Sequence, residues 1–167
     1  MSIVRPYSNG CELTLIGNKF RGINKIGSFT RDTQTSDFNV TLVARDNIFS
    51  GDTRIYCKNL AHGYLTFENN IFISDCYEML LQEFASGGNL IFNNNQVAIL
   101  FSNNGSYQGR LFVHYNDGLP ANPHFNIFEV IGNVVRGTSQ NIWLGMPNQS
   151  DCDTYTVSGN TFYSTPW

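Results

Sequence analysis

The sequence predicts an all-β solenoid, in which the chain winds once per repeat and stacks its windings along one axis. Two observations lead to this prediction. A ten-residue pattern recurs six times in the 167 residues, and each repeat carries a turn-forming residue followed by asparagine at the same place. The chain is accordingly rich in these types, with 21 asparagines and 15 glycines. The repeats are CELTLIGNKF, VTLVARDNIF, GYLTFENNIF, GNLIFNNNQV, NIFEVIGNVV and DTYTVSGNTF.

Each repeat is expected to form a strand, a one-residue bend and a second strand. Positions five and three residues before the asparagine, and two residues after it, are apolar or aromatic in every repeat. This alternation is the pattern of a half-buried strand. The residue just before the asparagine is always Gly, Asp or Asn, the types that tolerate a left-handed backbone. The asparagines are Asn18, Asn47, Asn70, Asn95, Asn133 and Asn160.

The spacing of these asparagines fits one coil of a solenoid per repeat, because they are separated by 29, 23, 25, 38 and 27 residues. Leucine-rich repeats have a similar period, but they need several leucines and a helical segment in each repeat, and this chain has no such frame. Tandem hairpins would need two-residue turns between paired strands. The spacing therefore favours about six coils in a single domain that covers residues 1–167.

Over residues 11–162 the sequence resembles the right-handed parallel β-helix family, the pectate-lyase-like superfamily, in its six GN, DN or NN pairs and the apolar frame around them. The resemblance implies a right-handed, single-stranded β-helix with three parallel sheets. It also implies that the six asparagines, which we call the ladder asparagines, point inward and stack on one another. Such a stack satisfies buried amides, because each amide hydrogen-bonds to the next.

Three sheets require a third strand in each coil, and a set of short segments provides candidates. They are RIYCK (54–58), EMLLQ (78–82), RLFVH (110–114) and NIWLG (141–145), with KIGSF (25–29) as a fifth. The predicted inward residues are Ile55 and Cys57, Met79 and Leu81, Leu111 and Val113, and Ile142 and Leu144. For EMLLQEFASGG a short helix that ends at the glycines is the alternative.

The outward positions of these third strands predict a binding surface, the aromatic stripe, formed by Tyr56, Leu80, Phe112 and Trp143, with Phe29 as a candidate fifth member. Aromatic faces stack on sugar rings while polar neighbours bind hydroxyls. We therefore expect polysaccharide to contact Arg54, Tyr56, Phe112 and Trp143. The alternative is a non-enzymatic structural or assembly protein whose stripe forms a subunit interface, for example in a homotrimer.

Catalysis is left open by the sequence. The resemblance implies a polysaccharide lyase, a glycoside hydrolase or a phage tailspike, with a site on this third sheet. The aspartate cluster of calcium-dependent pectate lyases is absent, as is the NTD, DD, GHG and RIK set of polygalacturonases. A hydrolase also needs two carboxylates facing one cleft, and Glu78 is the only acid on the stripe. The candidate catalytic residues are Lys58, Glu78, Arg110 and His114.

No cofactor or metal is expected from a motif, with calcium as the one candidate. Asp117 with Asn116 and Asn122, or Asp151 with Asp153, would offer oxygen ligands, although the same residues are ordinary turn formers. The cysteines lack the CxxC pairing of zinc and redox sites, and their spacing fixes no disulfide. They are Cys11, Cys57, Cys76 and Cys152.

Composition argues against several classes of partner. The net charge is −3 and ten basic residues are scattered along the chain, which disfavours nucleic-acid binding. No apolar stretch approaches the length of a membrane span, and the first residues lack the apolar core of a signal peptide. The resemblance implies an extracellular, cell-surface or virion location. Because no capping helix is evident, we expect a segment of a longer protein, or a subunit whose ends another chain covers.

Overall fold

The protein, described here from a computed structural model, is built from β-strands. The structure describes residues 2–4, 11–22, 24–28, 40–51, 53–60, 63–74, 78–84, 88–100, 110–114, 125–137 and 147–164. Within these ranges the only helical segment is the 3₁₀ turn η1 (Gln149–Asp151). The all-β prediction is confirmed. The helix alternative for residues 78–88 is wrong, because Glu78–Phe84 forms strand β10.

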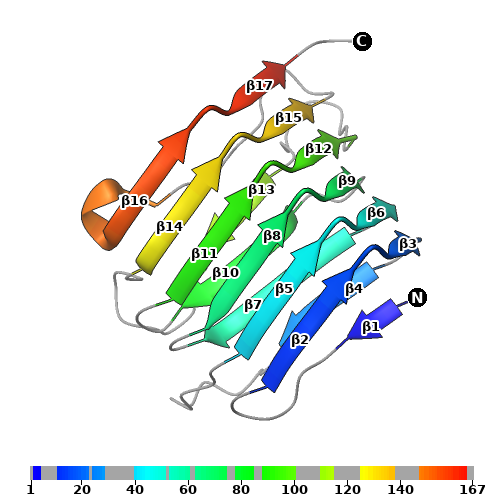
Figure 1. Ribbon diagram of the computed structural model, residues 1–167, viewed down its shortest axis with the longest axis horizontal. Coiled ribbons are helices and arrows are strands. Elements are labelled where there is room, and N and C mark those ends of the chain that lie inside the picture. The colour runs from blue at the N-terminus through cyan, green and yellow to red at the C-terminus, as the bar shows by residue number, and fades with distance from the viewer. Residues whose placement is uncertain are drawn as a thin grey trace.

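The described strands pair in parallel and form three sheets (Figure 1). Sheet A runs in the order β1 (Ser2–Val4), β4 (Asn24–Ser28), β7 (Thr53–Leu60), β10 (Glu78–Phe84) and β13 (Arg110–His114). Sheet B contains β2 (Cys11–Ile16), β5 (Val40–Arg45), β8 (Tyr64–Glu68), β11 (Gly88–Asn93), β14 (Phe125–Ile131) and β16 (Cys152–Ser158). Sheet C contains β3 (Lys19–Arg21), β6 (Ile48–Gly51), β9 (Ile71–Ser74), β12 (Gln96–Ile99), β15 (Val134–Gly137) and β17 (Thr161–Ser164). Each strand therefore pairs with strands of neighbouring repeats, which is a solenoid-like architecture.

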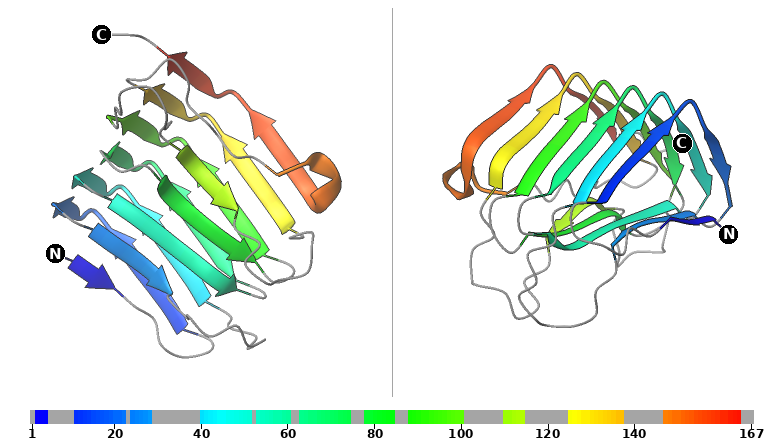
Figure 2. Two further views of the ribbon diagram at one scale, coloured as in Figure 1. Left: turned by 180° about the vertical axis from the view of Figure 1, so that it is seen from behind. Right: turned by 60° about the horizontal axis from the view of Figure 1, so that its bottom comes forward.

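Sheets B and C meet at the bends that precede the ladder asparagines, and Figure 2 (right) shows these bends aligned as a ridge with sheet A below. The predicted left-handed backbone is present at every bend. Short polar side chains that tolerate this conformation occupy the three bends that lack glycine. The φ angles are 67° at Gly17, 57° at Asp46, 56° at Asn69, 54° at Asn94, 67° at Gly132 and 64° at Gly159.

The core is filled by the apolar positions of the repeats. In the four central repeats all of these positions are buried, whereas in the first and last repeats they are half-buried or exposed. Phenylalanines from successive coils stack in a column, in which the ring centroids of Phe20 and Phe49 and those of Phe49 and Phe72 are 5.0 Å apart. The rings are nearly parallel, so each coil contributes aromatic stacking as well as apolar burial to its neighbour.

The ladder asparagines form one hydrogen-bonded stack inside the bends. Asn70 is fully buried and all four bonding positions of its amide are used. Its Nδ2 donates to the Ala44 carbonyl at 2.8 Å and to Asn95 Oδ1 at 3.0 Å. Its Oδ1 accepts from the main-chain N–H of Asn47 at 3.0 Å and from Asn47 Nδ2 at 3.1 Å. The amides thus replace the main-chain pairing that a bend interrupts.

The third strands exist where they are described, as β4, β7, β10 and β13 in sheet A, while residues 141–145 lie outside the described ranges. Their register differs from the prediction in one place. Leu80 stands opposite Phe112 as expected, but β7 places Ile55 opposite Leu80 and Tyr56 opposite Leu81.

This offset of one residue corrects the predicted aromatic stripe. Successive residues of a strand lie on opposite faces of a sheet, so Tyr56 does not belong to the row of Leu80 and Phe112. For the same reason Ile55 does not share a row with Met79. Phe29 and Trp143 lie outside the described residues.

Candidate binding groove on sheet C

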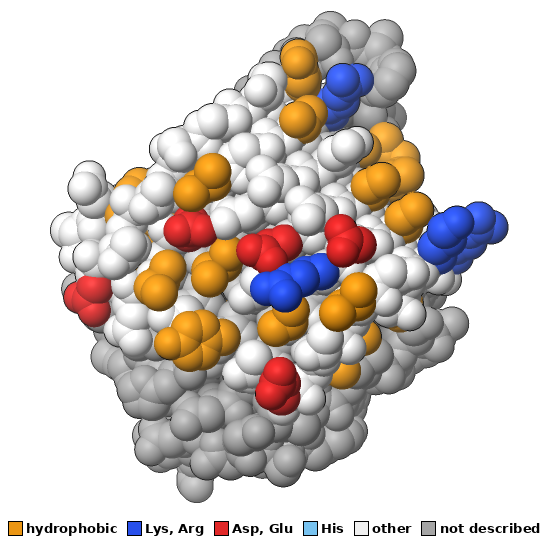
Figure 3. Space-filling model, in the orientation of Figure 1, with side chains coloured by type: hydrophobic (Ala, Val, Ile, Leu, Met, Phe, Trp, Pro, Cys, Tyr) orange, Lys and Arg blue, Asp and Glu red, His pale blue; other side chains and the backbone are white. Residues whose placement is uncertain are grey.

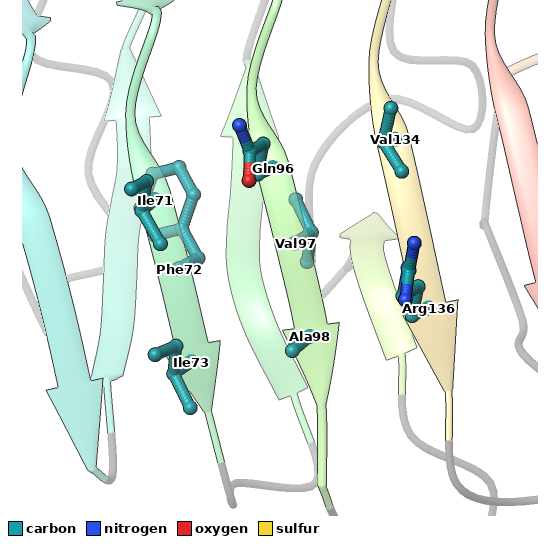
Figure 4. Close-up of a pocket in the computed structure, with 8 residues that line it drawn as sticks. All are labelled: Ile71, Phe72, Ile73, Gln96, Val97, Ala98, Val134 and Arg136. Atoms are coloured by element: carbon teal, nitrogen blue, oxygen red, sulfur yellow. The ribbon is translucent and has the colours of Figure 1, made fainter.

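A shallow groove of about 540 Å³ crosses the outer face of sheet C over three neighbouring strands (Figure 4). Phe72 and Val97 are buried on the inner face, so the outer lining consists of the residues that alternate with them. The groove is lined by Ile71, Phe72 and Ile73 of β9, Gln96, Val97 and Ala98 of β12, and Val134 and Arg136 of β15.

The register of sheet C explains the shape of this groove. Ala98 stands between Ile73 and Arg136, so a small side chain is flanked by two longer ones. In the adjacent row Gln96 stands between Ile71 and Val134. The groove therefore has an aliphatic floor. The amide of Gln96 and the guanidinium of Arg136 lie on the same outer face of sheet C. In Figure 3 hydrophobic side chains are visible on the right of the molecule, over sheet C.

Arg136 supplies the charge of the groove. Its guanidinium carbon lies 4.9 Å from the ring centroid of Tyr163, which stands opposite it on β17. This cation–π contact orients the side chain without neutralising it. Within the part of the chain that the structure describes, Arg136 makes no ion pair with a carboxylate. With respect to this part of the chain, the guanidinium is therefore available to bind an anionic group bidentately.

The outer face of sheet B differs because several of its charged side chains are paired. Arg45 Nε lies 2.6 Å from Glu68 Oε2, and Asn93 Nδ2 donates to the carboxylate of Glu129. Asn93 Oδ1 in turn accepts from the main-chain N–H of Ile131 at 3.0 Å. Figure 3 shows acidic side chains beside a basic one near the middle of the visible face. Paired charges of this kind leave less capacity for a ligand than Arg136 does.

The residues predicted from sequence to form a site lie on sheet A, apart from Trp143, which lies outside the described residues. Its register places Glu78 opposite Arg110, Gln82 opposite His114 and Glu83 opposite Lys58. The side chains of β7 and β10, and those of β13 apart from Leu111, lie outside what the structure describes. The roles predicted for Arg54, Tyr56, Lys58, Glu78, Arg110, Phe112, His114 and Trp143 therefore stay predictions.

The sequence-based reasoning missed the groove on sheet C, although a signal was present. The first and third residues after each ladder asparagine form the outer rows of sheet C. In the third repeat both of these residues are isoleucine, Ile71 and Ile73. Aliphatic residues facing outward on a strand indicate a contact surface. The groove joins strands of three repeats that are spaced 25 and then 38 residues apart along the chain, so it appears only once the register is known.

The calcium prediction stays a prediction at both of its positions. Asp117, Asn116 and Asn122 lie outside the described residues. At the other position Asp151 accepts hydrogen bonds from Asn148 Nδ2 at 3.0 Å and from Ser150 Oγ at 3.4 Å, as in an ordinary turn. Among the residues that the structure does describe, no three His, Cys, Asp or Glu side chains gather as metal ligands.

Cys152 is expected to be an unreactive thiol at neutral pH. Burial raises its pKa to about 11, and the carboxylates of Asp151 and Asp153 add to this effect. The thiol also donates to the Asn148 carbonyl at 3.7 Å. At pH 8 its thiolate fraction should be about a hundredfold below that of an unperturbed thiol, and its alkylation rate should rise with pH until about pH 11. Iodoacetamide labelling with mass mapping of the Cys152 peptide measures this, and equal rates in the folded and urea-unfolded chain would contradict it.

The comparisons with known proteins leave the groove as the main guide to function. Among the described residues, no helix has the length and apolar character needed to cross a membrane. No family model, curated protein or solved structure matches the chain.

Proposed function

We propose that the protein is a right-handed, single-stranded parallel β-helix of about six coils that binds an acidic polysaccharide. The parallel pairing of strands from neighbouring repeats and the left-handed bends support this architecture. The resemblance of residues 11–162 to the pectate-lyase-like superfamily suggests an extracellular, cell-surface or virion setting. The observation that carries the function is the aliphatic groove on sheet C with the charge of Arg136 beside it.

Each part of the groove matches one part of an acidic sugar. The C–H surface of a pyranose ring packs on aliphatic side chains such as Ile73 and Val134. The guanidinium of Arg136 binds a carboxylate or sulfate through two parallel hydrogen bonds. The exposed amide of Gln96 both donates and accepts, as a sugar hydroxyl requires. Because the groove is open and crosses three strands, it suits a chain better than an enclosed small molecule.

Binding without cleavage is the role we assign to this groove. Its lining residues include no carboxylate, whereas glycoside hydrolysis needs a pair of them. Phe112 and Trp143 are proposed as a second sugar-contacting surface, and Arg54 and Tyr56 are left out of it because they do not share the row of Phe112. Lys58, Glu78, Arg110 and His114 remain the candidates should that surface prove catalytic.

The proposal predicts that Arg136→Gln weakens binding of polygalacturonate by about tenfold or more, because a charge-assisted bidentate contact is lost. Binding of neutral dextran should be weak for both proteins. Affinity electrophoresis or isothermal titration calorimetry measures the effect, and circular dichroism confirms the fold. Arg45→Gln is the matched control, since Arg45 is paired with Glu68 and should leave polygalacturonate binding unchanged.

Trp143→Ala separates the two surfaces in the same assay. Loss of binding in Trp143→Ala alone would move the site to sheet A, and loss in Arg136→Gln alone would place it on sheet C. If neither change weakens retention of any acidic polysaccharide, the proposed function is wrong.

A further inference from the structure

The two ends of the solenoid expose residues that are buried everywhere else along it. Phe162 in the last repeat is 42% exposed, whereas its equivalents Phe49 and Phe72 are fully buried. At the other end Leu13, Leu15 and Phe20 are only partly buried, whereas their equivalents in the central repeats are buried. Exposed apolar core positions of this kind favour contact with another protein surface.

The ends also present strand edges with one paired side. Among the described strands, β2 and β3 are the last members of sheets B and C at the amino-terminal end, and β16 and β17 are the last at the other (Figure 1). An edge strand offers a row of main-chain N–H and C=O groups for further parallel pairing.

The ladder gives the two ends opposite hydrogen-bonding character. In every described step, the main-chain N–H and Nδ2 of one ladder asparagine donate to Oδ1 of the next, as Asn133 does to Asn160 at 2.9 Å. Within the described residues no ladder asparagine follows Asn160 to accept from it, and none precedes Asn18 to donate to its Oδ1. The described ladder therefore has one polarity, with its donors directed toward the carboxyl-terminal end and its acceptors toward the amino-terminal end.

We propose that the carboxyl-terminal end of the solenoid docks onto the amino-terminal end of a second molecule of this chain. Placing Asn160 of one molecule against Asn18 of the next continues the ladder with unchanged polarity. Val157 then meets Leu15, three residues before the asparagine, and Phe162 meets Phe20, two residues after it. Phe162 would extend the column of Phe20, Phe49 and Phe72 by one ring across the junction.

The outer rows match as well. Tyr163 of one molecule would stand opposite Arg21 of the next, because both lie three residues after their ladder asparagine. Arg136 and Tyr163 make the same kind of arginine–tyrosine contact between neighbouring coils of one molecule. At the amino-terminal end sheet A extends to β1, so β1 would follow the neighbour's β17 along the path of the solenoid.

This contact is heterologous, because the two molecules use different surfaces. When coils stack head to tail along one axis, the assembly does not close into a ring. Such a contact therefore produces linear assemblies of molecules. The inference does not depend on polysaccharide binding, since sheets B and C keep their outer faces in such a stack.

Sedimentation velocity across a wide concentration range tests the proposal on the unmodified chain. The expected result is a series of species at multiples of 18.8 kDa that grows with concentration. A protein that stays monomeric at all concentrations overturns the proposal.

Blocking variants test the direction of the contact. Phe162→Lys should raise the dissociation constant of the association about a hundredfold, because a lysine would be buried in the neighbour's core. Leu15→Lys should do the same from the other end. Each variant alone is expected to be monomeric, while an equimolar mixture forms a 1:1 dimer through the two intact ends. Tyr64→Lys, at an exposed position in a central coil, is the control and should associate like the unmodified chain.

A charge pair on exposed side chains keeps the test independent of folding defects. Tyr163→Lys places like charges at Arg21, so it should weaken association about tenfold. Mixing it with Arg21→Glu should restore association, because lysine then meets glutamate. Association that is unaffected by these changes, or dimers formed by either blocking variant alone, would show that another surface is used.

Discussion

Replacing Asn70 by leucine is expected to destabilise the protein by about 4 kcal/mol or more, although the two side chains are similar in size. The buried amide makes four hydrogen bonds, to Ala44, to Asn95 and twice to Asn47. Leucine makes none, so the Ala44 carbonyl, Asn95 Oδ1 and the N–H groups of Asn47 lose partners in a region that water does not reach. Each unsatisfied buried group costs about 1–3 kcal/mol.

Urea unfolding followed by circular dichroism measures this loss, with Asn18→Leu as the matched control. Asn18 is exposed at the end of the ladder and donates from Nδ2 to Ile16 and Asn47. Water can replace these bonds, so the control should lose about 1 kcal/mol or less. Equal losses for the two variants would mean that the buried stack contributes nothing special to stability.

The ladder was predictable because it imposes the same chemistry on every coil. Each bend needs a residue that tolerates a left-handed backbone, and the next residue places an amide inside. These two requirements leave a two-residue signature that is kept when other residues of the repeat change. Asn47 and Asn133 are thus recognisable although the repeats between them vary in length. The parallel pairing of sheets B and C follows from aligning these positions.

The register of sheet A was not predictable in the same way. The third strands carry no invariant residue, so β7 and β10 could be aligned only by the appearance of their apolar positions. The structure pairs Ile55 with Leu80, one residue away from that alignment. A side-chain period of two makes such a slip reverse the faces of the strand, which removes Tyr56 from the expected row.

The groove on sheet C depends on neighbours rather than on motifs. Ala98 creates a hollow only because Ile73 and Arg136 stand beside it, and the charge of Arg136 is available only because its described neighbour is Tyr163 rather than an acid. The sequence contains the residues but not their juxtaposition.

Phe72→Ala is the second change expected to have a large effect, with a loss of about 3–5 kcal/mol in the free energy of unfolding. The ring is fully buried and stacks between Phe49, at 5.0 Å, and Phe92, at 5.9 Å between centroids. Removing it leaves a cavity between coils and interrupts the aromatic column. Because each coil of a solenoid contacts only its neighbours, no distant part of the core can close this gap.

The matched control is Phe162→Ala, which removes the same ring from the end of the solenoid. Phe162 is 42% exposed, so the change should cost only about 1 kcal/mol in the isolated chain. Urea unfolding of both variants at low concentration, where association is negligible, measures the difference. If the column is continuous across molecules, the cost of Phe162→Ala should grow with protein concentration, while the cost of Phe72→Ala should not. If the loss in the free energy of unfolding is independent of protein concentration for both variants, the column does not extend from one molecule to the next.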